Sequence, residues 1–379
     1  MPDNFCDQFK SFLVMDILEK ACELEACGKE VIHMEVGQPD FDTPECVKEA
    51  AYQAIRDRKI GYTHSLGILE LREAICAYYH RTYGVEVHPG QVVVTPGTSP
   101  AMLLAAGSLL RRGDRVLLTD PHYACYPNFI RFVGAEPVFH RVCEGDGFQF
   151  TAAELDRMDT DPYAAVMLNS PSNPTGTLMN EDALQAACAS DMTVLSDEIY
   201  HGLVYEGRER SALEFTDDCF VFNGFSKLFA MTGWRLGYMI APKRHLPLIQ
   251  KLQQSFVIST NSVAQWAGIA ALTEAGEDVA RMKAVFNTRR LFLIDALKRL
   301  GFSLAVEPKG AFYVFVNASH LDTDSVRLAF DILDKAHVGV TPGVDFGPGG
   351  EGFLRFSYAT SMENIEEAMV RLEKYLSFC

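Results

Sequence analysis

The chain has 379 residues, of which 48% are hydrophobic and 22% are charged, and its formal net charge at pH 7 is −16. This length and composition are typical of a soluble globular protein of about two domains, and the excess of acid argues against nucleic acid or membrane surfaces as partners, because both favour a basic face. No apolar stretch approaches the length of a membrane span, and the N-terminus lacks the apolar core of a signal peptide, so we expect a cytoplasmic protein.

The N-terminal part of the chain is predicted to be mainly helical. Residues 1–14 are expected to form an arm. The apolar spacing of residues 16–27 predicts a helix, which Gly28 ends as a C-terminal cap. The elements expected next are a strand at 31–36, a loop of turn-forming residues at 37–44, a helix at 44–58, a second loop at 61–67 and a helix at 69–83.

The middle of the chain alternates between apolar strand-like runs and helical stretches. Strands are expected at 92–95, 116–119, 136–140, 164–168, 193–195 and 220–222, with helices such as 101–110 and 127–133 between several of them. The alternation predicts a mostly parallel sheet covered by helices on both faces. Such sheets bind ligands beyond the carboxyl ends of their strands, so polar residues that follow the strands are candidates for a site.

One such candidate is the turn Gly97-Thr98-Ser99, which lies between a strand and a helix. Free backbone N–H groups and the positive end of the helix predict an anion site there. Many α/β folds contain a similar turn, so a purely structural turn is the alternative.

The C-terminal part of the chain changes character after Gly301. Helices are expected at 247–254, 263–272 and 279–300, the last of them bent or broken, followed by short strands at 312–316 and 353–358 around a helix at 325–335, and a final helix at 362–378. We expect a large domain of residues 45–284 and a smaller, discontinuous α+β domain of residues 15–44 and 285–379, with residues 1–14 as the arm.

A lysine in apolar company follows the 220–222 strand and its turn. Ser226-Lys227 begins this stretch, and Arg235 lies eight residues after the lysine. A lysine desolvated near other cations loses basicity and becomes a nucleophile toward a carbonyl, and an arginine beside it suits a phosphate. A surface lysine and a structural arginine are the plainer alternative.

The stretch from Ser226 to Tyr238 resembles the Schiff-base segment of fold-type I aminotransferases, the aspartate aminotransferase family. The resemblance implies that Lys227 forms a Schiff base with pyridoxal 5'-phosphate, that Ser226 lies in the cofactor site, and that Arg235 binds the phosphate. It also implies the family's α/β fold, with a mostly parallel, seven-stranded-type sheet in the large domain and a smaller discontinuous domain.

Three further residues match the family's cofactor site. Asn173, in a proline-rich turn after the 164–168 strand, can offer an amide N–H to the ring oxygen of the cofactor. Asp197 follows the 193–195 strand, and a carboxylate under the pyridine nitrogen keeps the ring an electron sink. By resemblance, Tyr200 hydrogen-bonds the 3-oxygen. A plain turn and solvated acids are the alternatives from the residues alone.

The resemblance also assigns residues from other segments. Tyr123 is similar to the aromatic lid on the pyridine face, and Tyr62 to the tyrosine that family homodimers donate to the neighbouring subunit's phosphate. Arg355 resembles the arginine that grips the substrate's α-carboxylate, and Gly37 the glycine whose N–H helps there. A packed loop tyrosine and a turn glycine are the alternatives for Tyr123 and Gly37.

The resemblance implies an aminotransferase that moves an amino group between an L-amino acid and a 2-oxo acid. Lys227 would be the proton-transferring base, with Asp197 and Tyr200 completing the catalytic set. A carbon–sulfur β-lyase or a related lyase or synthase on the same scaffold is the nearest alternative, and a non-catalytic cofactor-binding regulator is a remote one. Ser99 stands where some aspartate-specific bacterial relatives carry a lysine, which leaves the amino donor open.

Ten scattered cysteines with no Cys-x-x-Cys pair predict free thiols and no metal site.

Overall fold

The computed structural model describes residues 9, 12–158 and 162–377. Its larger part is built on a seven-stranded sheet of order β2-β8-β7-β6-β5-β3-β4. The strands are β2 (Val92–Thr95), β3 (Arg115–Asp120), β4 (Glu136–Arg141), β5 (Tyr163–Asn169), β6 (Thr193–Asp197), β7 (Cys219–Gly224) and β8 (Gly237–Ile240). All neighbouring pairs are parallel except those of β8, which runs antiparallel to both β2 and β7. The predicted fold class is confirmed.

Alternate residues of the central strands enter two separate apolar layers. Val221 of β7 belongs to one buried cluster, and Phe220 and Phe222 belong to the other. The helices that pack over the sheet and its neighbours are α2 (Glu45–Arg56), α3 (Leu69–Tyr83), α4 (Thr98–Leu109), α5 (Tyr126–Phe132), α6 (Ala152–Met158), α7 (Glu181–Ala189), α8 (Leu246–Phe256) and α9 (Ser262–Glu274). Because both faces are covered, the strands are nearly continuous runs of buried residues, as in β2 and β7.

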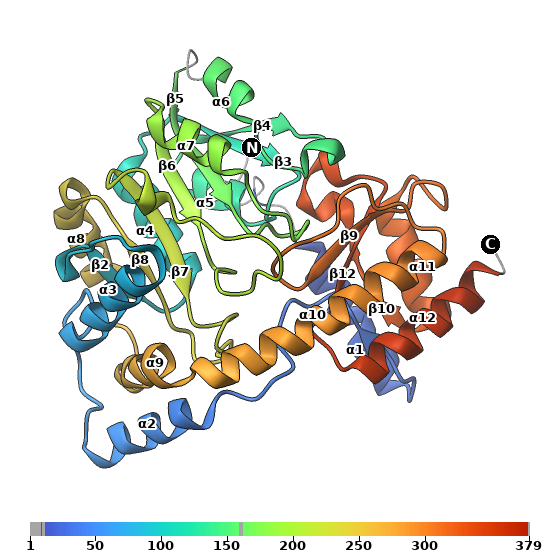
Figure 1. Ribbon diagram of the computed structural model, residues 1–379, viewed down its shortest axis with the longest axis horizontal. Coiled ribbons are helices and arrows are strands. Elements are labelled where there is room, and N and C mark those ends of the chain that lie inside the picture. The colour runs from blue at the N-terminus through green and yellow to red at the C-terminus, as the bar shows by residue number, and fades with distance from the viewer. Residues whose placement is uncertain (1–8, 10–11, 159–161, 378–379) are drawn as a thin grey trace, which may run out of the picture.

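The smaller part combines the two ends of the chain. It contains α1 (Leu13–Ala26), α11 (Ser325–Ala336), α12 (Met362–Leu376) and a three-stranded antiparallel sheet of β9 (Tyr313–Asn317), β11 (Thr341–Pro342) and β12 (Phe353–Ser357). Strand β1 (Ile32–His33) pairs in parallel with β10 (Val338–Gly339). In Figure 1, blue α1 therefore lies among the orange and red C-terminal elements.

A single helix joins the two parts. α10 (Gly276–Arg299) runs from beside α9 to the smaller part (Figure 1). The helix is uninterrupted, so the break that was considered for it is not present. Its interior contains neither glycine nor proline, and Met282, Phe286 and Leu293 keep one face buried.

Several other element boundaries in the structure differ from the predicted ones. α1 begins at Leu13, so the last two residues of the predicted arm are helical, while residues 1–8, 10 and 11 of that arm lie outside the described part of the chain. The strand expected at 31–36 is regular only over the two residues of β1. The helix expected from 101 begins at Thr98, directly after the glycine turn. β8 was not among the predicted strands.

Two features are absent from the described residues. Within those ranges, no helix is long and apolar enough to cross a membrane. No group of three or more His, Cys, Asp and Glu side chains in the same ranges could hold a metal ion.

Candidate active site

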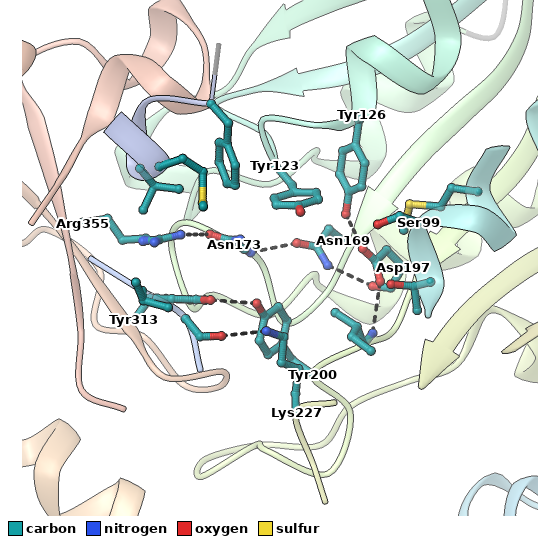
Figure 2. A pocket seen from close by; sticks show the side chains of 18 of the residues that line it. Ser99, Tyr123, Tyr126, Asn169, Asn173, Asp197, Tyr200, Lys227, Tyr313 and Arg355 are labelled. Atoms are coloured by element: carbon teal, nitrogen blue, oxygen red, sulfur yellow. Dashed lines mark hydrogen bonds between the residues drawn. The ribbon is translucent and has the colours of Figure 1, made fainter. Parts of the chain in front are cut away.

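A cavity of about 320 Å³ lies where the carboxyl ends of the large sheet face the smaller part of the molecule. Figure 2 shows Arg355 and Tyr313 on one side of it and Asp197 and Ser99 on the other. The predicted site residues that line the cavity are Gly37, Thr98, Ser99, Tyr123, Asn173, Asp197, Tyr200, Lys227 and Arg355. Residues predicted from eight separate segments therefore largely converge on one space.

Lys227 follows β7 and its turn, and its side chain projects into the cavity (Figure 2). Its Nζ donates a 2.6 Å hydrogen bond to the carbonyl oxygen of Gly37. Burial, followed by the positive charges of Arg355 and Arg235, lowers the pKa of Lys227 to about 8, and the charge of Asp197 acts in the opposite direction. A substantial neutral fraction near pH 8 makes this amine a nucleophile.

Asp197 ends β6 and is only 4% exposed. Its Oδ2 accepts a 2.6 Å hydrogen bond from the Tyr126 hydroxyl, and its Oδ1 accepts one from the Ile199 N–H at 3.2 Å. The pKa of Asp197 is raised to about 6, because the effect of burial exceeds that of these hydrogen bonds, which lower it. Asp197 is therefore mostly ionised at neutral pH, and it forms no ion pair with a lysine or arginine within the ranges 12–158 and 162–377.

Arg355 lies on β12 and is 3% exposed. Its guanidinium lies 4.3 Å from the ring centre of Tyr313 and 4.9 Å from that of Phe346. Its Nη1 donates to Asn173 Oδ1 at 2.8 Å and its Nη2 to Thr341 Oγ1 at 3.0 Å, and both acceptors are neutral.

The Nε of Arg355 is buried without a hydrogen-bond partner. No carboxylate of the described residues forms an ion pair with Arg355. A buried cation without a counter-ion is costly, so this site is suited to an anionic ligand.

A chain of hydrogen bonds connects Arg355 to Asp197 across the cavity. Beyond Asn173, whose side chain accepts from Arg355, the Asn173 N–H donates to Asn169 Oδ1 at 2.7 Å, and Asn169 Nδ2 donates to the backbone oxygen of Asp197 at 3.0 Å. The Tyr200 and Tyr313 hydroxyls lie 2.9 Å apart. These contacts fix the relative positions of the cation and the carboxylate (Figure 2).

Three contributors to this network were missed from the sequence: Tyr126, Asn169 and Tyr313. Asn169 is the last residue of a strand, at the edge where ligands bind, so its position was a usable indication. Tyr126 lies on α5 and Tyr313 on β9, and neither has a local feature that separates it from a packed aromatic residue.

Gly97 and Arg235 meet at the N-terminus of α4. A Cβ atom on Gly97 would lie 2.6 Å from Arg235 Nη2, and the φ of Gly97 is +97°. On the other side, a Cβ on Gly237 would lie 2.8 Å from the backbone nitrogen of Thr98. Two glycines thus let a guanidinium and the start of a helix approach one another, which creates a site for a phosphate-like anion.

Four predicted residues do not line the cavity itself. Gly97 and Arg235 adjoin it through Thr98 and Ser99, and Ser226 is half-buried next to Lys227. Tyr62 is 88% exposed, in the loop between α2 and α3, and contributes nothing to the cavity of this chain.

The chain was compared with known proteins. The model of the family "Aminotransferase class I and II" matches residues 29–372. The (5-formylfuran-3-yl)methyl phosphate transaminase of Methanocaldococcus jannaschii is 40% identical over 373 residues, covering 97% of this chain and 98% of the relative. The aspartate aminotransferase of Pyrococcus horikoshii is 38% identical over 371 residues, covering 96% and 94%.

Solved structures of other proteins share the fold of this chain. A Methanococcus jannaschii protein, whose active site is described as similar to those of kynurenine aminotransferases, superposes with a TM-score of 0.92 at 39% identity, covering 99% of this chain and 100% of that one. Thermus thermophilus aspartate aminotransferase with maleate gives a TM-score of 0.93 at 35% identity, covering 98% of each chain. These relatives support a transaminase over the β-lyase alternative.

Class I and II aminotransferases depend on pyridoxal phosphate and act on amino acids and 2-oxo acids. The site fits this coenzyme: Lys227 supplies an amine of lowered pKa, the Gly97 turn and Arg235 supply an anion cradle, and Asp197 supplies a buried carboxylate. Since the family model spans nearly the whole sequence and the cavity holds the groups that the coenzyme requires, this chain belongs to the class I and II aminotransferases and is a pyridoxal-phosphate-dependent transaminase.

Proposed function

We propose that Lys227 and Arg355 divide the work of amino-group transfer between them, with Lys227 holding the coenzyme and Arg355 holding the α-carboxylate of the amino acid or 2-oxo acid. The observation that carries this proposal is their placement in one cavity: an amine of lowered pKa and a buried arginine without a counter-ion. A carboxylate on Arg355 would satisfy the unpaired charge.

When bound, pyridoxal phosphate supplies an aldehyde carbon that an amine can attack and a ring that accepts electrons from the substrate's Cα–H bond. In our proposal Lys227 would hold the coenzyme at that carbon, and its free amine would take up and return the substrate's Cα proton. Asp197 would hold its negative charge toward the ring nitrogen, and Asn173 and Tyr200 would offer hydrogen bonds to the ring oxygen.

The phosphate end of the coenzyme is assigned to the N-terminus of α4. Gly97, Thr98 and Ser99 offer backbone N–H groups there, and the Arg235 guanidinium lies against Gly97. Ser226 adjoins Lys227 and belongs to the same end of the site. Tyr123, at the rim of the cavity, is assigned to the face of the ring, and the Gly37 N–H to the substrate carboxylate.

Replacement of Lys227 tests the assignment. We expect Lys227→Ala to lose transfer from amino acids to 2-oxo acids by a factor of at least about 10³, because both coenzyme attachment and proton movement are removed. Borohydride reduction of the native holoenzyme should add the coenzyme's mass to the peptide that contains Lys227. Lys243→Ala, at an exposed lysine that follows β8 and lies outside the cavity lining, is the matched control. Retained turnover in Lys227→Ala, or a mass tag on another peptide, would contradict the role.

We also propose that the chain forms a homodimer in which Tyr62 completes the neighbouring subunit's site. The exposed apolar side chains of Ile60 and Ile258, like Tyr62 itself, lie in two adjacent segments. Gln265 joins these segments by donating to Thr63 Oγ1 at 3.1 Å and to the backbone oxygen of Thr260 at 2.8 Å. A gathered set of exposed apolar side chains is typical of an interface.

A cytoplasmic location is part of the same proposal. The eight cysteines within the described ranges are all free, which suits a reducing compartment. The acidic composition also favours a freely diffusing protein rather than one bound to an anionic surface.

The division into two domains, 15–44 with 285–379 and 45–284, remains our proposal. The smaller, discontinuous domain is supported by the pairing of β1 with β10 and by the packing of α1 against β11. The proposed boundary at 284/285 lies within α10, so this helix would act as the rigid connection between the domains.

A further inference from the structure

The cavity has one wall that the assignments above do not use. Phe12 and three residues of α1, Val14, Met15 and Leu18, line it together with Val36. Phe12 also contacts the ring of Tyr123 edge-on, with 6.2 Å between ring centres. An apolar wall therefore faces the space beside the ring-stacking tyrosine, on the side of the smaller part of the molecule.

α1 is held against the cavity by an acid from the other end of the chain. The Asp345 carboxylate accepts hydrogen bonds from the N–H groups of Leu13 at 2.9 Å and Val14 at 3.3 Å. Phe12, the N-cap residue, makes no side-chain hydrogen bond to the helix, so Asp345 satisfies N–H groups that would otherwise be unpaired. Met15 and Leu18 are thereby fixed at the cavity.

The described residues that line the cavity offer no cation for a second carboxylate. Among the described residues that line it, the only basic side chains are Lys227 and Arg355, and both are assigned to other tasks. The Asp345 carboxylate, which accepts from the first N–H groups of α1, would repel an acidic side chain at this wall. A substrate carboxylate at this wall would lose water without gaining a partner, whereas an apolar side chain would gain from burial.

We propose that the preferred amino donors of this enzyme are α-amino acids with uncharged, apolar side chains, and that Met15 and Leu18 of α1 are specificity-determining residues. The proposal rests on the proposed function, because Arg355 and Lys227 fix the orientation of the amino acid. It names the substrate class of the same site.

The test uses the holoenzyme and single amino acids, so that no choice of 2-oxo acid enters. The conversion of the coenzyme to its amino form is followed by absorbance with leucine, methionine, phenylalanine, aspartate and glutamate. We expect kcat/KM for the best apolar amino acid to exceed that for either acidic one by at least about tenfold. Equal or faster conversion of aspartate or glutamate would overturn the inference and leave the proposed function intact. A holoenzyme that converts none of the five would overturn the proposed function itself.

Variants of α1 test the wall directly. Met15 is 53% exposed, so Met15→Arg should fold, and it should raise the kcat/KM ratio of glutamate to leucine by at least about tenfold, because it supplies the absent cation. Leu18→Arg is a second variant with the same expected direction. Cys22→Arg, at an exposed position of the same helix, is the control and should leave the ratio unchanged. If Met15→Arg and Leu18→Arg both leave the ratio as in Cys22→Arg, α1 does not contact the substrate side chain and the inference fails.

Discussion

At the scale of the residue, the chemistry of the site depends on which charges are paired and which are not. Asp197 is buried and receives hydrogen bonds only from neutral groups, and Arg355 has only neutral acceptors. Each is held in place by hydrogen bonds that leave its charge unneutralised. Lys227 lies between them in the same cavity, and its pKa reflects burial first and then the two arginines.

The lowered pKa of Lys227 predicts a pH dependence. Because only the neutral amine attacks an aldehyde, reductive capture of pyridoxal by coenzyme-free protein should rise with pH through about 8 and level off above it. Arg355→Met removes a positive neighbour, so it should move the midpoint to higher pH. The rate is measured by mass spectrometry of the Lys227 peptide after borohydride quenching, with Arg244→Met, an exposed arginine, as the control. A midpoint near 10.5, the ordinary lysine value, would show that Lys227 is not desolvated.

At the scale of the element, a residue of α10 binds the loop that contains Gly37. Arg289 of α10 makes two hydrogen bonds to the Asp40 carboxylate, of 2.7 and 2.8 Å, and its guanidinium lies over the Phe41 ring. Arg289 is nearly buried, whereas Asp40 is partly exposed. The pair connects the helix between the two parts of the molecule to the loop whose Gly37 carbonyl accepts from Lys227.

Breaking this pair should cost more than breaking an exposed pair on the same helix. Arg289→Met leaves Asp40 without its partner and should lower the free energy of unfolding by about 2 kcal/mol, less than for a fully buried pair because Asp40 still reaches water. Arg281→Met removes the exposed pair with Asp278 and should cost no more than about 0.5 kcal/mol. Urea denaturation of the two variants measures the difference, and equal losses would mean that Arg289 anchors nothing.

At the scale of the whole molecule, the proposed dimer makes the active site a property of two chains. Tyr62 is exposed and lies outside the cavity of its own chain. A symmetric pair can bring the same residue of each chain to the partner's site. The monomer should then have low activity, since it lacks one phosphate contact.

Mixed dimers test this sharing. Tyr62→Ala and Lys227→Ala chains should each have low activity alone, but a hybrid of the two contains one site with both native residues. Random mixing of equal amounts should restore about one quarter of the native activity, because half of the dimers are hybrids with one intact site each. Activity is measured after co-expression, with the mass in solution checked by light scattering. Hybrids that form without recovering activity would place Tyr62 in its own chain's site or in none.

Local sequence patterns were enough to predict many of the helices and strands and to suggest several candidate site residues. Lys227, Asp197 and Asn173 each follow a buried strand, and the edge of a parallel sheet gathers such residues whatever their separation along the chain. Their proposed roles came from the family resemblance. The helix at 69–83 was predicted to the residue, and the glycine that ends it, Gly84, has the left-handed backbone of a common C-terminal cap. The family resemblance added the assignments of Tyr123, Tyr62, Gly37 and Arg355, which spacing does not provide.

Tertiary structure alone decided the remaining features. β8 lies antiparallel between β7 and β2, and Asp345 pairs with the start of α1 from 332 residues away. Tyr126 and Tyr313 look like ordinary core aromatic residues until their hydroxyls meet Asp197 and Tyr200. The physical reason is the same in each case: a contact between distant segments is stabilised by burial and hydrogen bonding in the folded chain, and neither segment carries a local pattern that identifies its partner.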